Sequence, residues 1–303
     1  MAKYPSEVFG FYVTNNGPEA IKSRQNHWCP YHDSICFKKS RLLEVPFGVC
    51  TAHFEGDELA LCPRRFLENK KVFKDIANLC FQTTKDIILF SEVGLQGIGN
   101  FDFVMVKHKA LDYDIEDFII IEFQTGQTTN TGKLVDGFKD YISKAKFPAT
   151  KNYNFGINYY DIWKRTFTQI LNKGIILEKW KKKIFWVVQD QIFNYFQKKY
   201  RLTDLNYDEH HSTVFSLYDL KISGNKLDLI PTKKFSSTID SLFDSFRKNE
   251  DIPSVDIFYK HLKNKMKKEI NLSLKLDFGT VSSYIDAPRP SSTGRIREEN
   301  NSK

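Results

Sequence analysis

The stretch that most constrains this 303-residue chain runs from Phe101 to Gln124 and reads FDFVMVKHKALDYDIEDFIIIEFQ. Two apolar runs within it, Phe101–Val106 and Phe118–Phe123, are each long enough for one buried strand, and the polar residues between them suit a turn. Side chains two positions apart on a strand share a face, so Glu122 and Gln124 are expected to point the same way. An ionised carboxylate inside an Ile-Ile-Ile run is costly unless a partner or a metal compensates it.

Asp102 lies near the start of the first run, and Glu122 lies near the end of the second. If the two strands are neighbours, these carboxylates converge on one spot, with Gln124 just beyond it. Two carboxylates with room for water and a phosphate oxygen suit Mg²⁺, which takes few protein ligands. The pattern therefore indicates metal-assisted phosphodiester cleavage. The alternative is that both acids are ordinary solvated or salt-bridged residues, because a D…ExQ pattern alone also occurs by chance.

Glu92 is a third acid at the end of a predicted strand. The segment Asp86–Glu92 is followed by three glycines within six residues, which allow a tight connection into the strand that carries Asp102. A hairpin of this kind brings Glu92 close to Asp102. The alternative interpretation of Glu92 is a solvated turn residue.

The composition predicts a soluble globular protein. Hydrophobic residues make up 41% and charged residues 27% of the chain, and the longest apolar runs are far too short to span a bilayer. The first residues lack the apolar core of a signal peptide, so we predict a cytoplasmic location. A net charge of +8 is compatible with a nucleic-acid partner. Basic runs lie at 179–183, 198–201, 233–234 and 260–268, with aromatic residues in or near them. Such runs are either solvated helix faces or a surface that contacts the DNA backbone.

Four of the five cysteines fall in the first 67 residues, a segment that we predict to be rich in loops and to have little core of its own. Disulfides are not expected in the cytoplasm, so Cys29, Cys36, Cys50 and Cys62 indicate a structural metal site that staples this segment. Two alternatives stay open: the cysteines pack as small hydrophobic residues, or a histidine replaces one of them as a ligand. The nearby histidines are His27, His32 and His53. Cys80 lies in an apolar stretch and is expected in the core.

Strands that alternate with helices, and acids on adjacent central strands, indicate an α/β fold with a mixed central sheet flanked by helices. Helices are predicted at 66–80, 134–144, 159–172, 191–200, 237–247 and 254–268. Strands are predicted at 86–92, 101–106, 118–123, 184–189 and 271–277, and a hairpin is predicted from 213–223 and 226–231. The predicted organisation is a metal-binding segment at 1–67, a core at 68–285 and a polar, disordered tail at 286–303. Dinucleotide-binding, phosphate-loop, zinc-protease and hydrolase-elbow motifs are absent.

In the order of these motifs the chain resembles the PD-(D/E)XK nuclease superfamily, and within it the NotI-like type II restriction endonucleases. The resemblance covers about residues 25–130. It rests on Cys29, Cys36, the GVC around Cys50 and the CPRRF that begins at Cys62, followed by Glu92, FDFVMV and IIIEFQT. Phe101 replaces the proline of the superfamily signature, and Gln124 replaces its lysine, as the NotI-like group leads one to expect.

The resemblance implies a PD-(D/E)XK nuclease core with a small N-terminal four-cysteine segment, and a homodimer that cleaves both strands of a palindromic duplex with Mg²⁺. It implies Asp102 and Glu122 as the Mg²⁺ ligands, with Gln124 and Glu92 as further catalytic residues. It implies iron in the four-cysteine site, although four thiolates bind zinc equally well. A cognate DNA methyltransferase encoded nearby is expected. Two alternatives are a related repair or transposition nuclease and a non-catalytic DNA-binding module.

Overall fold

A computed structural model describes residues 2–110, 112, 114–144, 152–200, 202–203, 205–247 and 254–268 of the chain. The chain divides into two compact units, residues 1–249 and 250–303. In the second unit the structure describes one helix, α8 (Val255–Lys268). All the sheets among the described residues, and the candidate site, lie in the first unit.

A six-stranded sheet lies at the centre of the first unit, with the strand order β14-β13-β12-β9-β8-β7. The pairs β9–β12 and β12–β13 are parallel and the other three are antiparallel, so the predicted mixed sheet is confirmed. Antiparallel neighbours need only a short turn, whereas parallel neighbours need a crossover, which here is helical. The strands are β7 (Ile87–Leu95), β8 (Gly99–His108), β9 (Ile115–Gln124), β12 (Lys183–Gln189), β13 (Thr213–Ser223) and β14 (Lys226–Ser237).

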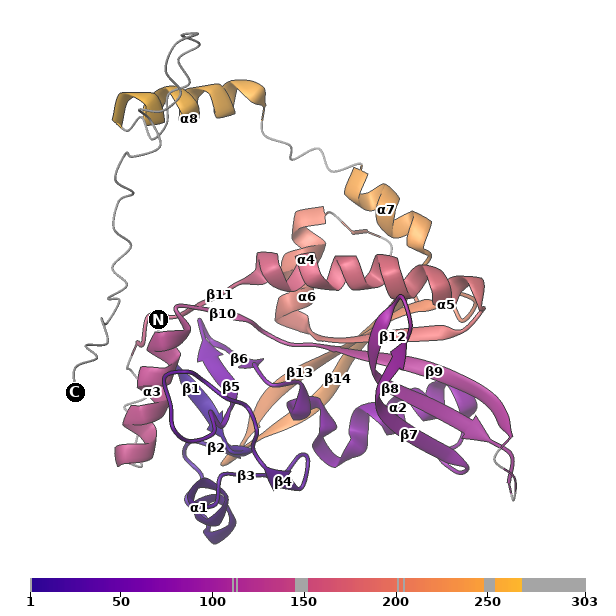
Figure 1. Cartoon of the computed structure of the whole chain (residues 1–303), viewed down its shortest axis with the longest axis horizontal. Helices are drawn as coiled ribbons and strands as arrows, with labels where there is room; N and C mark the ends of the chain where they lie inside the picture. Colours follow the sequence, from indigo (N-terminus) through magenta and orange to yellow (C-terminus); the bar gives the residue numbers. More distant parts are fainter. Residues whose placement is uncertain are drawn as a thin grey trace, which may run out of the picture. The chain divides into compact units, whose positions relative to one another are not determined.

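Helices cover both faces of this sheet (Figure 1). On one face lies α2, and on the other lie α4, α6 and α7, together with a π-helix η2 and α5. A strand that is buried on both faces reads as a continuous apolar run, which explains the Ile-Ile-Ile of β9. Ile119 and Ile121 pack toward α2, and Ile120 packs toward α4. The helices are α2 (Lys71–Phe81), α4 (Tyr159–Gln169), η2 (Ile170–Gly174), α5 (Ile175–Lys179), α6 (Asp190–Tyr200) and α7 (Ile239–Arg247).

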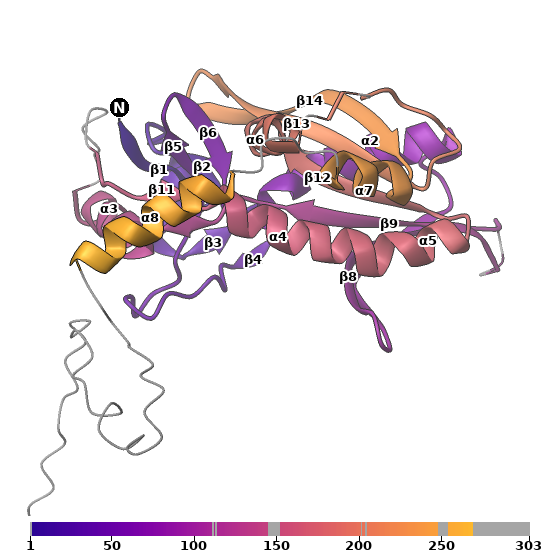
Figure 2. The same cartoon turned by 90° about the horizontal axis from the view of Figure 1, so that it is seen from above.

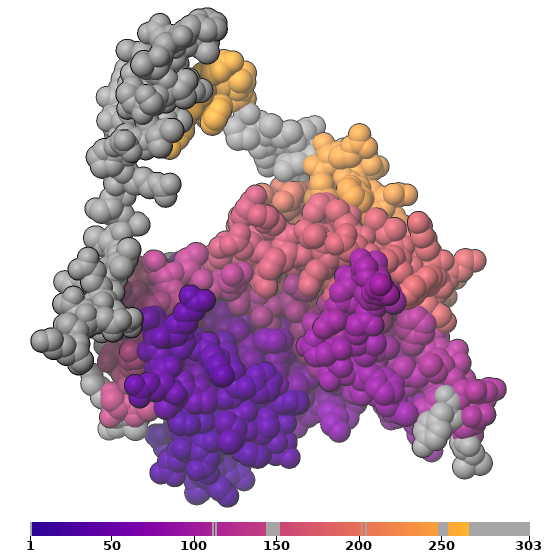
Figure 3. Space-filling view, in the orientation of Figure 1, coloured from indigo at the N-terminus to yellow at the C-terminus, as the bar shows by residue number. Residues whose placement is uncertain are grey.

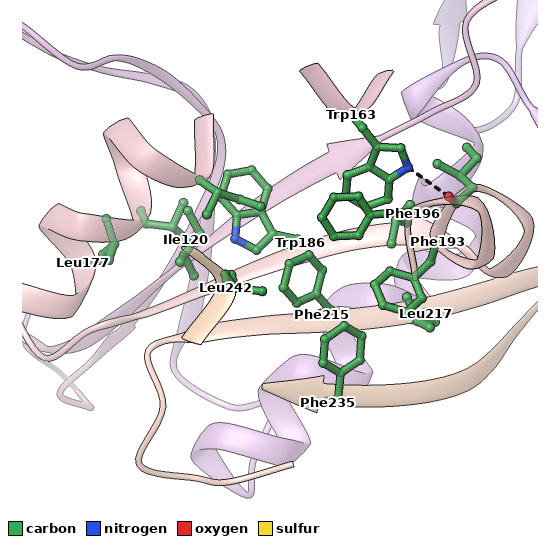
Figure 4. Close-up of a cluster of buried hydrophobic side chains, with 14 of the residues drawn as sticks. Ile120, Trp163, Leu177, Trp186, Phe193, Phe196, Phe215, Leu217, Phe235 and Leu242 are labelled. Atoms are coloured by element: carbon green, nitrogen blue, oxygen red, sulfur yellow. Dashed lines mark hydrogen bonds between the residues drawn. The ribbon is translucent and has the colours of Figure 1, made fainter. Parts of the chain in front are cut away.

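Aromatic side chains fill the space between the sheet and helices α4 and α6 (Figure 4). The rings of Trp163 and Phe196 stack with centroids 3.7 Å apart, and those of Phe215 and Phe235 stack at 4.8 Å. The indole nitrogen of Trp163 donates to the carbonyl of Ile192 at 3.0 Å, which satisfies its buried donor. This packing fixes α4 against the end of β9, where the candidate site lies.

The N-terminal segment has a sheet and a core, so the prediction that it has little core of its own is wrong. Four strands pair in the order β2-β1-β5-β6, and the segment that contains them forms one continuous part of the surface (indigo to purple in Figure 3). Six of the sixteen buried residues in the core under this sheet come from later in the chain: Leu134, Val135, Phe138 and Tyr141 of α3, and Tyr153 and Phe155. Short strands whose apolar partners are about 90 residues away leave a weak local pattern. The elements are β1 (Lys3–Val8), β2 (Phe11–Tyr12), β5 (Val49–Phe54), β6 (Asp57–Ala60) and α3 (Thr131–Lys144).

The helix predicted from residue 66 begins five residues later. Residues Pro63–Lys70 form a 3-10 helix, η1, in which Asn69 and Lys70 have φ angles of 51° and 54°. Such left-handed residues end a helix, so α2 begins only at Lys71. The shorter elements are α1 (Pro18–Gln25), β3 (Trp28–Cys29), β4 (Ser34–Ile35), β10 (Thr128–Thr129) and β11 (Gly156–Ile157).

The other predicted elements agree with the structure to within a few residues, with two exceptions: β14 continues to Ser237, and the helix predicted at 159–172 continues through η2 and α5 to Lys179. The hairpin between β13 and β14 turns at Gly224, whose φ of 62° suits glycine. The strand predicted at 271–277 and the tail from 286 lie outside the described residues. No helix in the described part of the chain has the length and apolar character needed to cross a bilayer.

Candidate functional site

The site is built where β8 and β9 stop pairing. These two strands are antiparallel neighbours, and their last ladder pair toward this end is Phe103 with Ile121. Asp102 and Glu122 are the next residues on each strand. An Asp102 carboxylate oxygen, Oδ2, accepts a hydrogen bond from the backbone N–H of Phe123 at 2.8 Å. The carboxylate thus lies across the end of β9, beside Glu122.

Glu92 stands opposite Asp102 on the other side. In the β7–β8 ladder the pairs Ser91–Phe103 and Val93–Phe101 flank the position where Glu92 faces Asp102. Burial raises the pKa of Asp102, and the charge of Glu92 raises it further. Three adjacent strands therefore each contribute one acid, from an exposed Glu92 through a half-buried Asp102 to a buried Glu122. Within the described residues, no three or more His, Cys, Asp or Glu side chains are grouped so as to hold a metal ion.

Glu122 is the most unusual of the three acids because its side chain is 0% exposed. Burial and the charge of Asp102 raise its pKa to about 7. Its Oε1 accepts a hydrogen bond from the ammonium of Lys173 at 2.7 Å, and this contact keeps the pKa from rising further. Its Oε2 is buried and has no hydrogen-bond partner among the described residues. An unpartnered carboxylate oxygen next to a second carboxylate fits Mg²⁺, which needs one or two such ligands.

Gln124 points to the same face as Glu122, as the strand period predicts, but its amide is already engaged. Its Oε1 accepts from the hydroxyl of Thr166 at 2.8 Å, and its Nε2 donates to the Oε1 of Gln169 at 2.9 Å. Both partners belong to α4. One N–H of the amide is left for another acceptor.

Lys173 is the residue of this site that sequence reasoning missed. It comes from η2, is 5% exposed, and donates at 2.7 Å to the carbonyl of Asn100 as well as to Glu122. Lys173 is 51 residues from Glu122 along the chain. The sequence does contain a local signal for an inward-facing lysine. Thr166, Ile170 and Lys173 recur at helical spacing and form one buried stripe, in which a lysine is unusual.

The four N-terminal cysteines line one cavity of about 230 Å³, together with Phe9, Phe37, Phe47 and Arg64 among others. None of the four is in a disulfide. Burial raises the pKa of the thiols of Cys29, Cys36 and Cys50. Four thiols around one apolar cavity are the donor set that iron or zinc takes, although they are not drawn together into a ligand cluster here.

The alternative ligands do not line the cavity, although His27 and His32 pack against the rings of Phe9 and Phe37, which do. None of the three nearby histidines lines the cysteine cavity, and His53 instead pairs with Glu58 at 2.9 Å and stacks on Tyr4. Cys80 lies on α2 and packs, partly buried, against the core under the central sheet.

One of the basic and aromatic stretches forms a second surface feature. A cavity of about 250 Å³ between α4, α6 and α7 is lined by aromatic rings and by Lys164 and Lys199. The Lys199 ammonium lies 4.8 Å from the ring centre of Tyr160, which is 59% exposed. Interleaved lysines and exposed aromatic rings of this kind suit contact with a nucleic-acid backbone.

Comparison with known proteins adds one match. The family model described as restriction endonuclease NotI matches residues 22–226. The matched range includes the four cysteines, the three acids, Gln124 and Lys173. No curated protein matches the chain.

Proposed function

Because the chain belongs to the NotI restriction endonuclease family and is therefore a site-specific type II deoxyribonuclease, we propose that it cleaves double-stranded DNA with Mg²⁺ at Asp102 and Glu122. The main support is the buried Oε2 of Glu122, which lacks a hydrogen-bond partner and lies beside Asp102. A mixed sheet with acids on adjacent strands is also what a PD-(D/E)XK nuclease core requires, and we propose that core for residues 68–285.

In this proposal each residue has a separate task. Asp102 and Glu122 hold Mg²⁺, which when bound polarises the scissile phosphodiester and lowers the pKa of a water molecule. Glu92, at the exposed edge of the row of acids, either accepts the proton of the attacking water or contributes to a second metal ion. The free N–H of Gln124 donates to that water or to a phosphate oxygen. Because two hydrogen bonds already hold the amide of Gln124 against α4, the side chain is fixed and can make one further contact.

The recognition site is proposed to be palindromic and the working enzyme a homodimer. One chain holds one row of acids, whereas a double-strand break requires two cleavages. A twofold dimer on a twofold-symmetric site places one cleavage site on each strand. A methyltransferase that modifies the same sequence would protect the host DNA, and we propose that one is encoded nearby.

The first test compares Asp102→Asn and Glu122→Gln with wild type on plasmid DNA in Mg²⁺. Wild type is expected to give discrete fragments whose sequenced ends define one symmetric site. The protein bound to DNA is expected to have twice the mass of one chain. Both variants keep the shape of the side chain but lose its charge, so they should bind DNA and not cut it. Glu116→Gln is the matched control, because Glu116 lies on the same strand, is exposed and pairs with Lys107 at 3.1 Å.

Near-normal cleavage by either variant would show that the site is assigned wrongly. A smear of products from wild type would instead favour a repair or transposition nuclease without site specificity. Binding without any cleavage by wild type would favour a non-catalytic DNA-binding module.

A further inference from the structure

We propose that Lys173 is a positioning residue of the cleavage site, which fixes the Glu122 carboxylate so that its free oxygen faces the metal position and which supplies the cation that Gln124 lacks. The inference rests on the proposed function, since it names the group that prepares one of the two proposed Mg²⁺ ligands.

The contacts of Lys173 connect the two strands that carry the acids. Its ammonium donates to the backbone carbonyl of Asn100 on β8 and to Oε1 of Glu122 on β9, each at 2.7 Å. Asn100 lies two residues before Asp102. One side chain therefore sets the position of the Glu122 carboxylate relative to the strand of the other ligand.

The same contacts decide which oxygen of Glu122 stays available. Oε1 is occupied by Lys173, and Oε2 is the buried oxygen without a partner. A carboxylate bound at one oxygen cannot rotate freely, so the other oxygen is held in place before a metal arrives. Groups that orient a metal ligand in this way commonly matter as much as ligand contacts do, because they remove the cost of ordering the ligand.

A buried ammonium needs a reason to be in this place. Lys173 is 5% exposed, and burying a charge is costly unless the charge is paired and hydrogen-bonded. The carboxylate, the carbonyl and the ring of Phe101, 5.3 Å away, offset that cost. If fold stability alone were at issue, a hydrophobic residue at this position and another at Glu122 would serve equally well.

The side chains that bind Glu122 and Gln124 all come from one helical stretch. Helix α4 continues through η2 into α5 alongside β9 (Figure 2). Thr166 and Gln169 on it bind Gln124, and Lys173 binds Glu122. The lysine lies within the π-helical turn, a local irregularity that is frequent at functional sites. The positive charge that the superfamily signature places on the strand thus comes here from the neighbouring helix.

The test uses Lys173→Gln, which removes the charge, and Lys173→Arg, which keeps it. The first readout is Mn²⁺ binding to the free protein by calorimetry, and the second is the rate of plasmid cleavage at saturating DNA. A positioning role predicts that Lys173→Gln loses about 10- to 100-fold in Mn²⁺ affinity and in cleavage rate, with DNA affinity unchanged and with part of both losses restored in Lys173→Arg. The matched control is Lys107→Gln, which removes a partly exposed lysine that pairs with Glu116 between the same two strands.

If the ion pair between Lys173 and Glu122 only stabilises the fold, Mn²⁺ affinity is expected not to fall in Lys173→Gln. Lys173 would then compete with the metal for Glu122, so Mn²⁺ affinity in Lys173→Gln would be equal to or higher than in wild type, and that result would overturn the proposal. If wild type itself neither binds Mn²⁺ nor cuts DNA, the proposed function fails instead.

A crystal structure of the wild-type protein with DNA and Ca²⁺ decides the question even if Lys173→Gln does not fold. We expect the Lys173 ammonium to stay within hydrogen-bond distance of Glu122 Oε1 while the ion lies at Oε2. An ammonium that leaves Glu122 when the ion binds would contradict a positioning role.

Discussion

Gln124 shows how one residue can differ from the role that its place in a motif implies. At the position where the proposed PD-(D/E)XK signature would have a lysine, a neutral amide joins the end of β9 to α4 through two hydrogen bonds. A lysine there would have no acceptor for the hydroxyl of Thr166, whose single proton is shared between Oε1 of Gln124 and the carbonyl of Ile162. The amide suits the helix contacts, and the cation lies at Lys173.

A change of Gln124 to Glu separates the packing of this residue from its charge. Thr166 can still donate to a carboxylate, and the amide of Gln169 can turn to donate as well, so we expect the melting temperature to stay within a few degrees of wild type. The added negative charge beside the buried Glu122 should repel the phosphate, and we expect cleavage to fall by about 10²-fold or more. Cleavage rates and thermal melts check this.

The control for that change is Asn225→Asp, which converts an amide to a carboxylate in the exposed turn between β13 and β14. Gln124→Ala adds a second comparison, because it removes both helix contacts without adding charge. Full activity in Gln124→Ala would show that the residue does not position the nucleophile.

At the scale of elements, how much the sequence predicts depends on how local the cause is. The strand period places Glu122 and Gln124 on one face, and the short hairpins make β7, β8 and β9 neighbours, so the row of three acids follows from residues 87–124 alone. The buried stripe of Thr166 and Ile170 marks Lys173 as facing inward, but its contact with Glu122 forms only when α4, η2 and α5 pack along β9, and that packing is not specified within one element. The N-terminal sheet was missed for the same reason, because α3 completes its core.

Arg65 in η1 is a second contact between distant elements. Its guanidinium is 0% exposed and binds Glu7 of β1 at 2.8 Å, Glu68 of η1, and the carbonyl of Leu227 in β14 at 2.7 Å. Glu7 in turn accepts a hydrogen bond from Tyr31 at 2.5 Å. Since Tyr31 and Arg65 lie two and three residues after Cys29 and Cys62, this cluster also positions the chain around the cysteine cavity.

Arg65→Met should therefore destabilise the protein strongly. The change leaves the carboxylate of Glu7 buried without its cation, which costs about 3–5 kcal/mol in the free energy of unfolding. Adding Glu7→Gln should recover part of that loss, because the remaining buried group is then neutral. Lys71→Met is the control: its ion pair with Asp75 is exposed and long at 3.7 Å, and such pairs contribute about 0–1 kcal/mol. Urea denaturation of wild type, Arg65→Met, the double variant and Lys71→Met measures the free energy of unfolding. Equal losses of stability in Arg65→Met and Lys71→Met would show that Arg65 does not hold these elements together.

At the scale of the whole molecule, the N-terminal sheet changes what the cysteines are expected to do. The sequence predicts a segment that depends on metal for its structure, whereas the sheet has its own apolar core and the Arg65 cluster. A metal ion at the four cysteines would then order the loops around the cavity without being needed to fold the segment.

Elemental analysis of protein purified without chelator tests the cysteine site. We expect one equivalent of iron or zinc per chain, kept in Cys80→Ser and lost in Cys50→Ser, since Cys80 lies outside the cavity. Removal of the metal should increase hydrogen exchange in residues 26–48 while β1 and β5 stay protected, because their core is independent of the ion. Metal that survives the loss of Cys50 would point to a histidine ligand, and a stable, active wild type without metal would refute the site.

The Lys173 contacts also have a consequence for the order of events during folding. The hairpins of β7, β8 and β9 close over a few residues, whereas the contacts of Lys173 span 51 residues to Glu122 and 73 to Asn100. Closing long loops costs more chain entropy, so such contacts generally form late. A chain growing from the ribosome would present its acids about fifty residues before the lysine that orients Glu122 exists. On the proposed mechanism, full cleavage activity is reached only when α4 and its continuation dock, so the sheet alone is a poor nuclease.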